Sequence, residues 1–259
     1  VHKFYKVSPP DPWMMNSGNA TMICVDSKAA EDYFTDAGLP DNKIMITGSI
    51  SHDGLYREAR AKKTRLVGLR AKLRLSSKKP VLLVSGCPNQ LAGKVPHCEF
   101  SSMREIANHV GRVCQKLNKY YDVIVRPHPN FLEFGELLRP WGVRVTLIPT
   151  STLIPLSDLF IAFASATIRW SIVSSVPTIN YDIFNYRYVD FIQAKGVAHV
   201  YSAREFERIF KRITLDEKFY SRQKRLIKKD AKYWGSVDGL SLDRIEGVIK
   251  TAKEKMLVD

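Results

Sequence analysis

Short apolar runs that alternate with helical patterns dominate residues 80–200. Residues 81–85, 122–126 and 159–163 are nearly continuous apolar runs, which are typical of strands covered on both faces. Between them, apolar residues recur at helical spacing, as over 102–117, where Ser102 and Glu105 form the pattern of a capping box. Further strands are expected at 143–148 and 178–181, and further helices at 132–138 and 168–175. The alternation predicts an α/β fold with a Rossmann-like, doubly wound parallel sheet.

The first quarter of the chain carries a shorter pattern of the same kind. Strands are expected at 22–26 and 43–47, with a helix at 28–37 between them that Ser27 would cap. Residues 55–75 form a basic helical pattern, and we expect a break near Gly68. These pieces are too few to complete a sheet, so they predict a remnant of a preceding domain.

Four segments follow from these patterns. Residues 1–54 are expected to end an amino-terminal domain, and 55–79 to form a helical bridge. Residues 80–200 are the predicted Rossmann-like domain, and 201–259 are predicted to be carboxyl-terminal helices with amphipathic spacing. The chain begins without Met and does not resemble a domain start, so we expect it to be part of a longer protein.

A surplus of positive charge limits the classes of binding partner that the sequence favours. The chain has 40 Lys and Arg residues against 26 Asp and Glu, a net charge of +14. Such a charge attracts polyanions, anionic membrane surfaces or phosphorylated substrates without choosing among them. The basic residues cluster at 57–79 and 204–232, and two solvated helix faces are the favoured explanation of these clusters.

Cysteine usage and hydropathy indicate the compartment. Cys24, Cys87, Cys98 and Cys114 show neither CxxC pairing nor zinc-ligand spacing, so no metal site is predicted. We expect Cys24 and Cys114 to be buried, reduced thiols, which favours the cytoplasm. No apolar run has the length of a membrane span and no signal peptide is recognised, so any membrane association is expected to be peripheral, at the inner face.

The segment Asp-Val-Ile-Val-Arg-Pro-His-Pro, residues 122–129, carries the main chemical signal. Pro127 and Pro129 cannot extend a strand, so His128 is expected on a stiff turn at the carboxyl end of the strand. Open α/β sheets bind their ligands at this edge. With Arg126 two residues earlier, His128 is predicted to meet an anion, most simply a phosphate; the alternative is an exposed histidine in a turn.

Two other strand ends carry small or polar residues. Gly86 follows the strand at 81–85, and Ser165, Ala166 and Thr167 follow the strand at 159–163. Small residues let a phosphate approach the backbone, hydroxyls donate to it, and a helix start offers free N–H groups. Taken alone, Ser-Ala-Thr before a helix is more often an ordinary cap. Its position beside the His128 turn favours a phosphate-binding loop.

These motifs resemble the carboxyl-terminal half of a GT-B glycosyltransferase. The similarity rests on Arg126 to Pro129, Ser157-Asp-Leu-Phe-Ile161, Ser165-Ala-Thr167 and Val176-Pro-Thr-Ile-Asn-Tyr-Asp182. Within that class they resemble CMP- or CDP-using enzymes of bacterial surface polysaccharides: capsule Kdo transferases, sialyltransferases with a His-Pro motif, and CDP-glycerol glycerophosphotransferases of teichoic acid. Residues 238–245 resemble the tail helix of the last group.

The resemblance implies a transferase acting on a nucleotide-activated donor, with a glycan or lipid-linked acceptor. It implies further that 80–200 is the nucleotide-donor-binding domain and that 1–54 is the end of an acceptor-side domain. It implies that His128 is catalytic and meets the donor phosphate near Arg126, that Ser165 and Thr167 hold the same phosphates, and that Asp182 lines the crevice. No cofactor or metal is expected, since histidine can offset leaving-group charge. The catalytic base stays unassigned: His52 and Asp53 are candidates, although their position at the start of the bridge favours a structural role.

Two other functions remain open. An isomerase similar to the UDP-N-acetylglucosamine 2-epimerases shares the fold but would need further acidic and histidine residues facing the sugar. A non-enzymatic nucleic-acid-binding module would use the basic helices. No RNA- or DNA-binding signature is recognised and aromatic residues are not interleaved with the basic runs, so no nucleic acid partner is expected.

Overall fold

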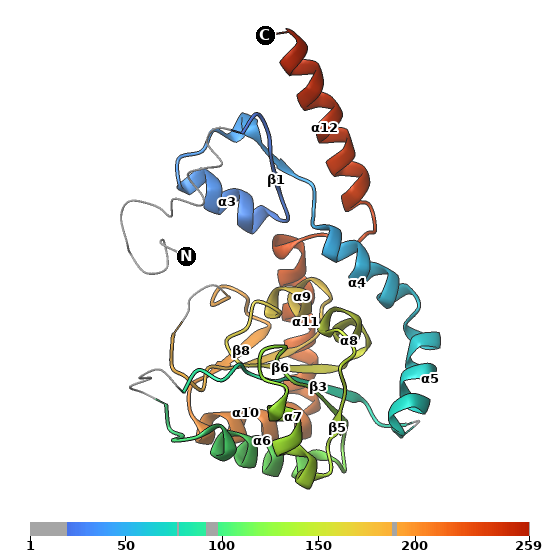
Figure 1. The fold of residues 1–259 in the computed structure, drawn as a ribbon, viewed down its shortest axis with the longest axis vertical. Helices are drawn as coiled ribbons and strands as arrows, with labels where there is room; N and C mark the ends of the chain where they lie inside the picture. Colours follow the sequence, from blue (N-terminus) through green and yellow to red (C-terminus); the bar gives the residue numbers. More distant parts are fainter. Residues whose placement is uncertain (1–19, 77, 92–97, 188–190, 259) are drawn as a thin grey trace.

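A computed structural model describes residues 20–76, 78–91, 98–187 and 191–258 of the chain. Its larger part is a six-stranded sheet with helices on both faces, and a small β-α-β unit lies beyond one end of it (Figure 1). The strands are β1 Ile23–Val25, β2 Ile44–Ile46, β3 Val81–Ser85, β4 Asp122–Arg126, β5 Arg144–Val145, β6 Leu159–Ala162, β7 Thr178–Tyr181 and β8 Val197–Val200.

The helices account for most of the remaining described residues. They are α3 Lys28–Asp36, α4 Ile50–Arg60, α5 Lys62–Leu73, α6 Met103–Leu117, α7 Glu133–Leu138, α8 Thr150–Leu153, α9 Ile168–Val173, α10 Ala203–Leu215, α11 Glu217–Trp234 and α12 Ser241–Val258. Short 3-10 turns lie at Asp41–Lys43, Arg139–Trp141 and Ile154–Leu156. Among the described residues, no helix is long and apolar enough to cross a membrane.

The large sheet confirms the predicted fold class. Its order is β5-β4-β3-β6-β7-β8, and every neighbouring pair is parallel. With β3 taken as the first strand, this is the 3-2-1-4-5-6 order of the Rossmann fold. The chain moves from β3 to one side through β4 and β5, then crosses to β6 on the other side. The order therefore reverses between β3 and β6.

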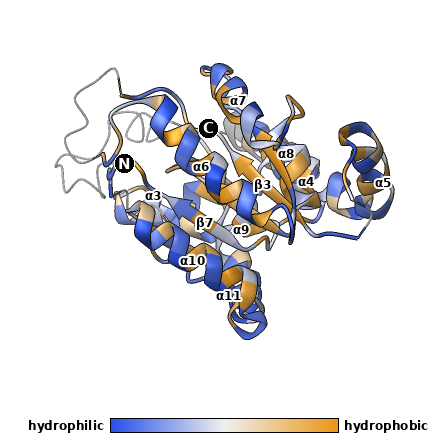
Figure 2. Cartoon of the chain, turned by 90° about the horizontal axis from the view of Figure 1, so that it is seen from below, coloured by the Kyte–Doolittle hydropathy of each residue, from blue (hydrophilic) through white to orange (hydrophobic). Residues whose placement is uncertain are grey.

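Two apolar layers hold the sheet between its helices. On one face, Val84 and Val125 pack with α6, α7 and α10; on the other, Leu83 and Ile124 pack with α4, α5, α8, α9 and α11. Successive strand residues point to opposite faces, so only a continuous apolar run can serve both layers. Figure 2 shows the hydrophobic strands between helices whose outer sides are largely hydrophilic, α10 above all.

The capping residues of α6 and α10 have the geometry that their sequences indicate. Ser102 Oγ accepts the N–H of Glu105 at 3.2 Å, and Ser202 Oγ accepts that of Glu205 at the same distance. In both cases the glutamate accepts the N–H of the residue before the cap, Ser101 or Tyr201, at 2.8 Å. Each helix therefore begins where its polar signal lies.

Several element boundaries differ from the sequence prediction. The bridge is two helices, α4 and α5, which meet at Ala61 rather than near Gly68. Gly68 lies inside α5, where a helical glycine costs only about 1 kcal/mol and does not force a break. The strand expected at 143–148 is reduced to Arg144–Val145, and edge strand β8 was not predicted.

The amino-terminal unit has its own small core. β1 and β2 pair in parallel, and Ile23, Val25, Leu39 and Ile44 pack together beneath α3. Cys24, expected to be buried, is exposed, because none of the residues that the structure describes covers its face of this two-stranded sheet. The unit is tied to the larger domain through the hydroxyl of Tyr233, which donates to Asp32 at 2.9 Å.

The carboxyl-terminal helix α12 runs back beside the amino-terminal unit (Figure 1). Its start is held by α4, since the two carboxylate oxygens of Asp53 accept the N–H groups of Ser241 and Leu242, each at 3.0 Å. Gly48 also packs closely against Ser241: a Cβ at Gly48 would lie only 2.5 Å from Ser241 Oγ. The predicted tail segment 238–245 is therefore fixed to the start of α4.

Replacing Asp53 with alanine is expected to cost about 1–3 kcal/mol of unfolding free energy, because two helix N–H groups lose a buried, charged acceptor. Burial opposes ionisation, but the N–H groups of Ser241 and Leu242 hold the pKa of Asp53 below its usual range. The contribution is therefore present above the ordinary carboxylate pKa and is lost as the pH falls below it. Urea unfolding at pH 7 and pH 3 measures both effects. Asp53→Asn is the control and should lose less; equal stability of wild type and Asp53→Ala would contradict the cap.

Candidate functional site

The carboxyl ends of β3, β4 and β6 bring most of the predicted site residues to one edge of the sheet. The register pairs Ser85 with Arg126 and Val84 with Ile161, so the loops after β4 and β6 flank the end of β3. Two strand spacings separate β4 from β6, about 10 Å. This edge lies at the point where the strand order reverses, the usual ligand position in such sheets.

Gly86 lies directly against the His128 turn. Its N–H donates to the carbonyl of Arg126 at 2.8 Å, and a Cβ at this position would lie 3.0 Å from Pro127 Cα and 3.1 Å from His128 N. A side chain here would push the turn away from β3. Glycine therefore lets the loops after β3 and β4 pack backbone to backbone.

The His128 imidazole is partly exposed and has a defined orientation. Its Nδ1 accepts the N–H of Asn130 at 3.1 Å, which leaves Nε2 to carry the proton. Burial and, secondarily, the charge of Arg126 lower the pKa of His128, so the ring is neutral at pH 7. A neutral imidazole with Nε2–H is a hydrogen-bond donor to an anion.

Arg126 shapes the turn that carries His128. Its guanidinium donates through Nη1 to the carbonyl of Pro127, and within the described residues its Nε is buried without a hydrogen-bond partner. The guanidinium is a positive charge beside the imidazole. Arg126 therefore adds positive potential to this edge of the sheet.

The loop after β6 carries a strained residue and two hydroxyls. Ala164 has a φ of +47°, a left-handed conformation that is unfavourable for a residue with a Cβ. Ser165 and Thr167 share a hydroxyl–hydroxyl bond of 2.9 Å, and the exposed Ala166 lies between them. One hydroxyl hydrogen of the pair stays available to a ligand.

The helix start at this loop is less open than its sequence indicates. α9 has six residues, and Ser165 O accepts the N–H of Ile168 while Ala166 O accepts that of Arg169, both at 3.1 Å. The N–H of Thr167 bonds to Ser165 Oγ at 3.3 Å. The expectation of free N–H groups here was wrong, because the residues before the helix fold into turns that use them.

The structure gives Asp182 a structural position rather than one facing the crevice. Its side chain is buried, and its carboxylate accepts the N–H groups of Tyr186 at 3.1 Å and Arg187 at 2.7 Å. It thus organises the loop that follows β7. This carboxylate stabilises the fold of the loop.

The proposed acceptor-side base also has a structural environment. His52 is 1% exposed, and a Cβ at Gly235 would lie 2.7 Å from His52 Cε1. Burial lowers its pKa, and Asp53 beside it caps α12. Both side chains are buried, which agrees with the structural role that their position in the sequence favours.

Sequence reasoning did not assign Arg169, Asp26, Asn180 or His199. Arg169, in the first turn of α9, forms an ion pair with Asp26 at the end of β1 and lies over the ring of Trp234. The carboxyl end of β1 therefore faces the Ser165–Thr167 loop. Asn180 could have been noticed as a polar residue inside a buried strand, whereas Asp26 and Arg169 are 143 positions apart and carry no local signal.

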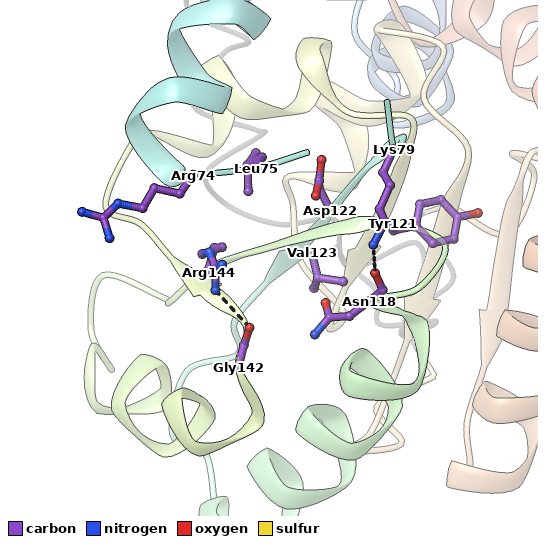
Figure 3. A pocket seen from close by; sticks show the side chains of 9 residues that line it. All are labelled: Arg74, Leu75, Lys79, Asn118, Tyr121, Asp122, Val123, Gly142 and Arg144. Atoms are coloured by element: carbon purple, nitrogen blue, oxygen red, sulfur yellow. Dashed lines mark hydrogen bonds between the residues drawn. The ribbon is translucent and has the colours of Figure 1, made fainter. Parts of the chain in front are cut away.

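A pocket of about 220 Å³ lies at the opposite edge of the sheet, where β4 and β5 begin (Figure 3). Two of its cations are already engaged: Lys79 donates to the carbonyl of Asn118, and Arg144 Nη1 to that of Gly142 at 3.3 Å. Figure 3 shows Arg74 pointing away from the other lining residues. This pocket is separate from the candidate site. Its lining residues are Arg74, Leu75, Lys79, Asn118, Tyr121, Asp122, Val123, Gly142 and Arg144.

The parallel six-stranded sheet and its flanking helices match the GT-B Rossmann-like α/β fold, and comparisons with solved structures agree on the fold. No family model and no curated protein matches the sequence. The wall teichoic acid polymerase TagF has a similar fold, with a TM-score of 0.63 at 18% identity over 96% of this chain and 64% of that one. A TagF variant soaked with CDPG gives 0.65 at 16% identity, over 96% of this chain and 63% of the other.

Epimerases show the same degree of similarity. The UDP-GlcNAc 2-epimerase from Neisseria meningitidis, bound to UDP-GlcNAc, has a TM-score of 0.65 at 12% identity and covers 96% of this chain and 67% of that one. The S. aureus MnaA–UDP structure gives 0.60 at 14% identity, over 95% and 65%. At these identities the similarity establishes the fold, and this chain spans about 64% of the length of TagF.

Proposed function

We propose that this chain contains the donor-binding part of a GT-B transferase that uses a CMP- or CDP-activated donor in bacterial surface polysaccharide synthesis. The observation that carries the proposal is the gathering of Gly86, His128 and the Ser165–Thr167 loop at the switch point between β3 and β6. The fold shared with TagF, including a variant soaked with CDPG, supports this choice of donor.

In the proposed reaction, a hydroxyl of a glycan or lipid-linked acceptor attacks the donor. The bond to the nucleotide breaks, and the leaving phosphate gains negative charge. His128 Nε2–H, whose tautomer Asn130 maintains, would donate to that phosphate, and the free hydroxyl hydrogen of the Ser165–Thr167 pair would donate from the other side. Arg126 would add positive potential without a metal ion. The acceptor base would come from outside the residues assigned here.

A cytoplasmic location at the inner face of the membrane belongs to the same proposal. The net charge of +14, with basic clusters over 57–79 and 204–232, would favour an anionic surface. Acceptors of this chemistry are anchored to that membrane or grow from it. The basic helix faces would then bring the donor domain to its acceptor.

Nucleotide-dependent thermal stabilisation tests the proposal. CMP or CDP should raise the melting temperature while UDP does not, because a ligand that binds only the native state adds about 2.7 kcal/mol at 100 times its Kd. For a chain of this size that corresponds to a shift of about 5 °C or more. ATP is the control for non-specific polyphosphate binding to a basic protein.

The outcomes separate two candidate functions. Stabilisation by UDP alone would instead favour a UDP-N-acetylglucosamine 2-epimerase-like isomerase, which remains a candidate because the epimerase structures match the fold as well as TagF does. Stabilisation by none of these nucleotides would reject both. Equal stabilisation by all of them, lost at 0.5 M salt, would indicate charge attraction without a nucleotide site.

A further inference from the structure

A chain of hydrogen bonds connects the Ser165–Thr167 loop to edge strand β8. Ala164 N–H donates to Asn180 Oδ1 at 2.9 Å, and Asn180 Nδ2 lies 3.1 Å from His199 Nδ1. His199 Nε2 lies 3.1 Å from the carbonyl oxygen of Phe191. The register explains the alignment, since Ala162, Asn180 and His199 are cross-strand neighbours on β6, β7 and β8.

Only one arrangement of protons gives every hydrogen bond between Ala164 and Phe191 a donor and an acceptor. Ala164 supplies an N–H, so Asn180 must present its oxygen to it and its NH₂ to His199. His199 Nδ1 must then accept, and Nε2 must carry the proton that the Phe191 carbonyl receives. A proton on Nδ1 would place two donors face to face. If the Asn180 amide rotated to relieve that clash, its NH₂ would meet the N–H of Ala164.

The Ala164 end of this chain is where the backbone is strained. A left-handed φ of +47° at a residue with a Cβ persists only where the surroundings maintain it. Asn180 is 6% exposed and supplies the one side-chain acceptor for this N–H. Ser165 and Thr167 follow directly, so their hydroxyl positions depend on the Ala164 conformation.

We propose that Asn180 and His199 are positioning residues for the donor-phosphate loop, and that protonation of His199 releases Ala164 from its strained conformation and lowers donor affinity. The role in donor binding rests on the proposed function; the control of Ala164 does not. The loop binds the donor when His199 is neutral with its proton on Nε2. Acid pH weakens binding by protonating His199, which lies outside the site.

The surroundings of His199 favour that neutral form. Burial lowers its pKa, the Phe191 carbonyl and the Asp182 carboxylate partly offset this, and the ring is neutral at pH 7. Near the ends of β8, Asp230 on α11 accepts the N–H of Gly196, Glu205 on α10 accepts that of Tyr201, and Arg187 lies over the Tyr201 ring. Loss of the ordered loop is therefore expected as the pH falls below about 6.5, the ordinary histidine value.

Two measurements on the chain test the proposal. NMR hydrogen exchange follows the Ala164 amide without ligand, corrected for the intrinsic effect of pH. Calorimetry with CDP-glycerol follows donor affinity, because its pyrophosphate does not titrate near pH 6. In the wild type, Ala164 protection should fall between pH 7 and pH 5. Affinity should fall relative to that of His199→Asn over the same range, because the charge of His128 changes equally in both proteins. Asn180→Ala should lose the protection at every pH and weaken binding about tenfold.

His199→Asn is the decisive variant, because its amide oxygen takes the place of Nδ1 as an acceptor but does not titrate. It should keep Ala164 protected at pH 7 and remove the loss at pH 5. His109→Asn is the matched control. His109 is also buried with a lowered pKa, but it lies on α6 and takes no part in the hydrogen bonds that connect Ala164, Asn180 and His199. It should leave the pH dependence of Ala164 unchanged.

The two proposals fail in different ways. Failure of the wild type to bind CDP-glycerol, with Ala164 protection still governed by Asn180 and His199, would reject the proposed function and leave the positioning role intact. Unchanged Ala164 protection in Asn180→Ala, or an undiminished acid effect in His199→Asn, would overturn the positioning role. Binding of CDP-glycerol by Asn180→Ala at wild-type strength would overturn its link to donor affinity.

Discussion

Replacing His128 with alanine is expected to weaken nucleotide binding about 10- to 150-fold while leaving the fold stable. A hydrogen bond to a charged group contributes about 1.5–3 kcal/mol, and each 1.4 kcal/mol is a factor of ten in affinity. His128 is partly exposed and lies outside both core clusters, so its removal leaves no large cavity. Calorimetric titration with CDP and a thermal melt of the same sample measure the two quantities.

Substituting asparagine or glutamine for His128 distinguishes its role in the turn from its contact with the phosphate. In His128→Asn an oxygen takes the Nδ1 position, where it can still accept the N–H of Asn130, but no donor remains at the Nε2 position. It should lose affinity like the alanine variant. In His128→Gln an NH₂ group can reach the Nε2 position and should restore part of the affinity. A collapse of the melting temperature in all three variants would identify His128 as a packing residue.

The largest loss of stability is expected from Gly196→Ala, about 3 kcal/mol. A Cβ at Gly196 would lie 2.3 Å from Ile227 N and 2.4 Å from Ile227 Cα. These atoms belong to the backbone of α11, so no side-chain rotation relieves the overlap and the helix must shift. The shift would also disturb the 2.7 Å bond from Gly196 N to Asp230. Urea unfolding measures the cost.

Gly68→Ala is the matched control for Gly196→Ala. Gly68 lies inside α5, and a Cβ there would meet no atom within 4 Å. Alanine is the better helix former by about 1 kcal/mol, so this variant should gain stability. Unchanged stability of Gly196→Ala would show that α11 does not pack on β8 as closely as described.

The sequence by itself determined the central strands and the place where the His128 turn begins. The bounds of β3 and β4 agree with the predicted ones, because strands buried on both faces need nearly continuous apolar runs. β7 also has its predicted bounds, although Thr178 and Asn180 interrupt its apolar pattern. Pro127 ends β4 for a local reason, the missing N–H, and the caps of α6 and α10 are equally local. Such signals act within a few residues, so a single sequence displays them.

Only the tertiary structure decided what each polar group faces. β8 is a short edge strand with polar and apolar residues mixed, which gives a weak pattern. Asp182 and Asp53 looked available in the sequence, but neighbouring backbone N–H groups take up their oxygens.

The Asn180–His199 pair and the Asp26–Arg169 ion pair exist because the strand order brings distant residues together. The hydrophobic periodicity of a sequence indicates how deeply each residue is buried. It does not record which strand lies beside it, and in this protein the neighbouring strand β7 supplies Asn180, the acceptor of the Ala164 N–H.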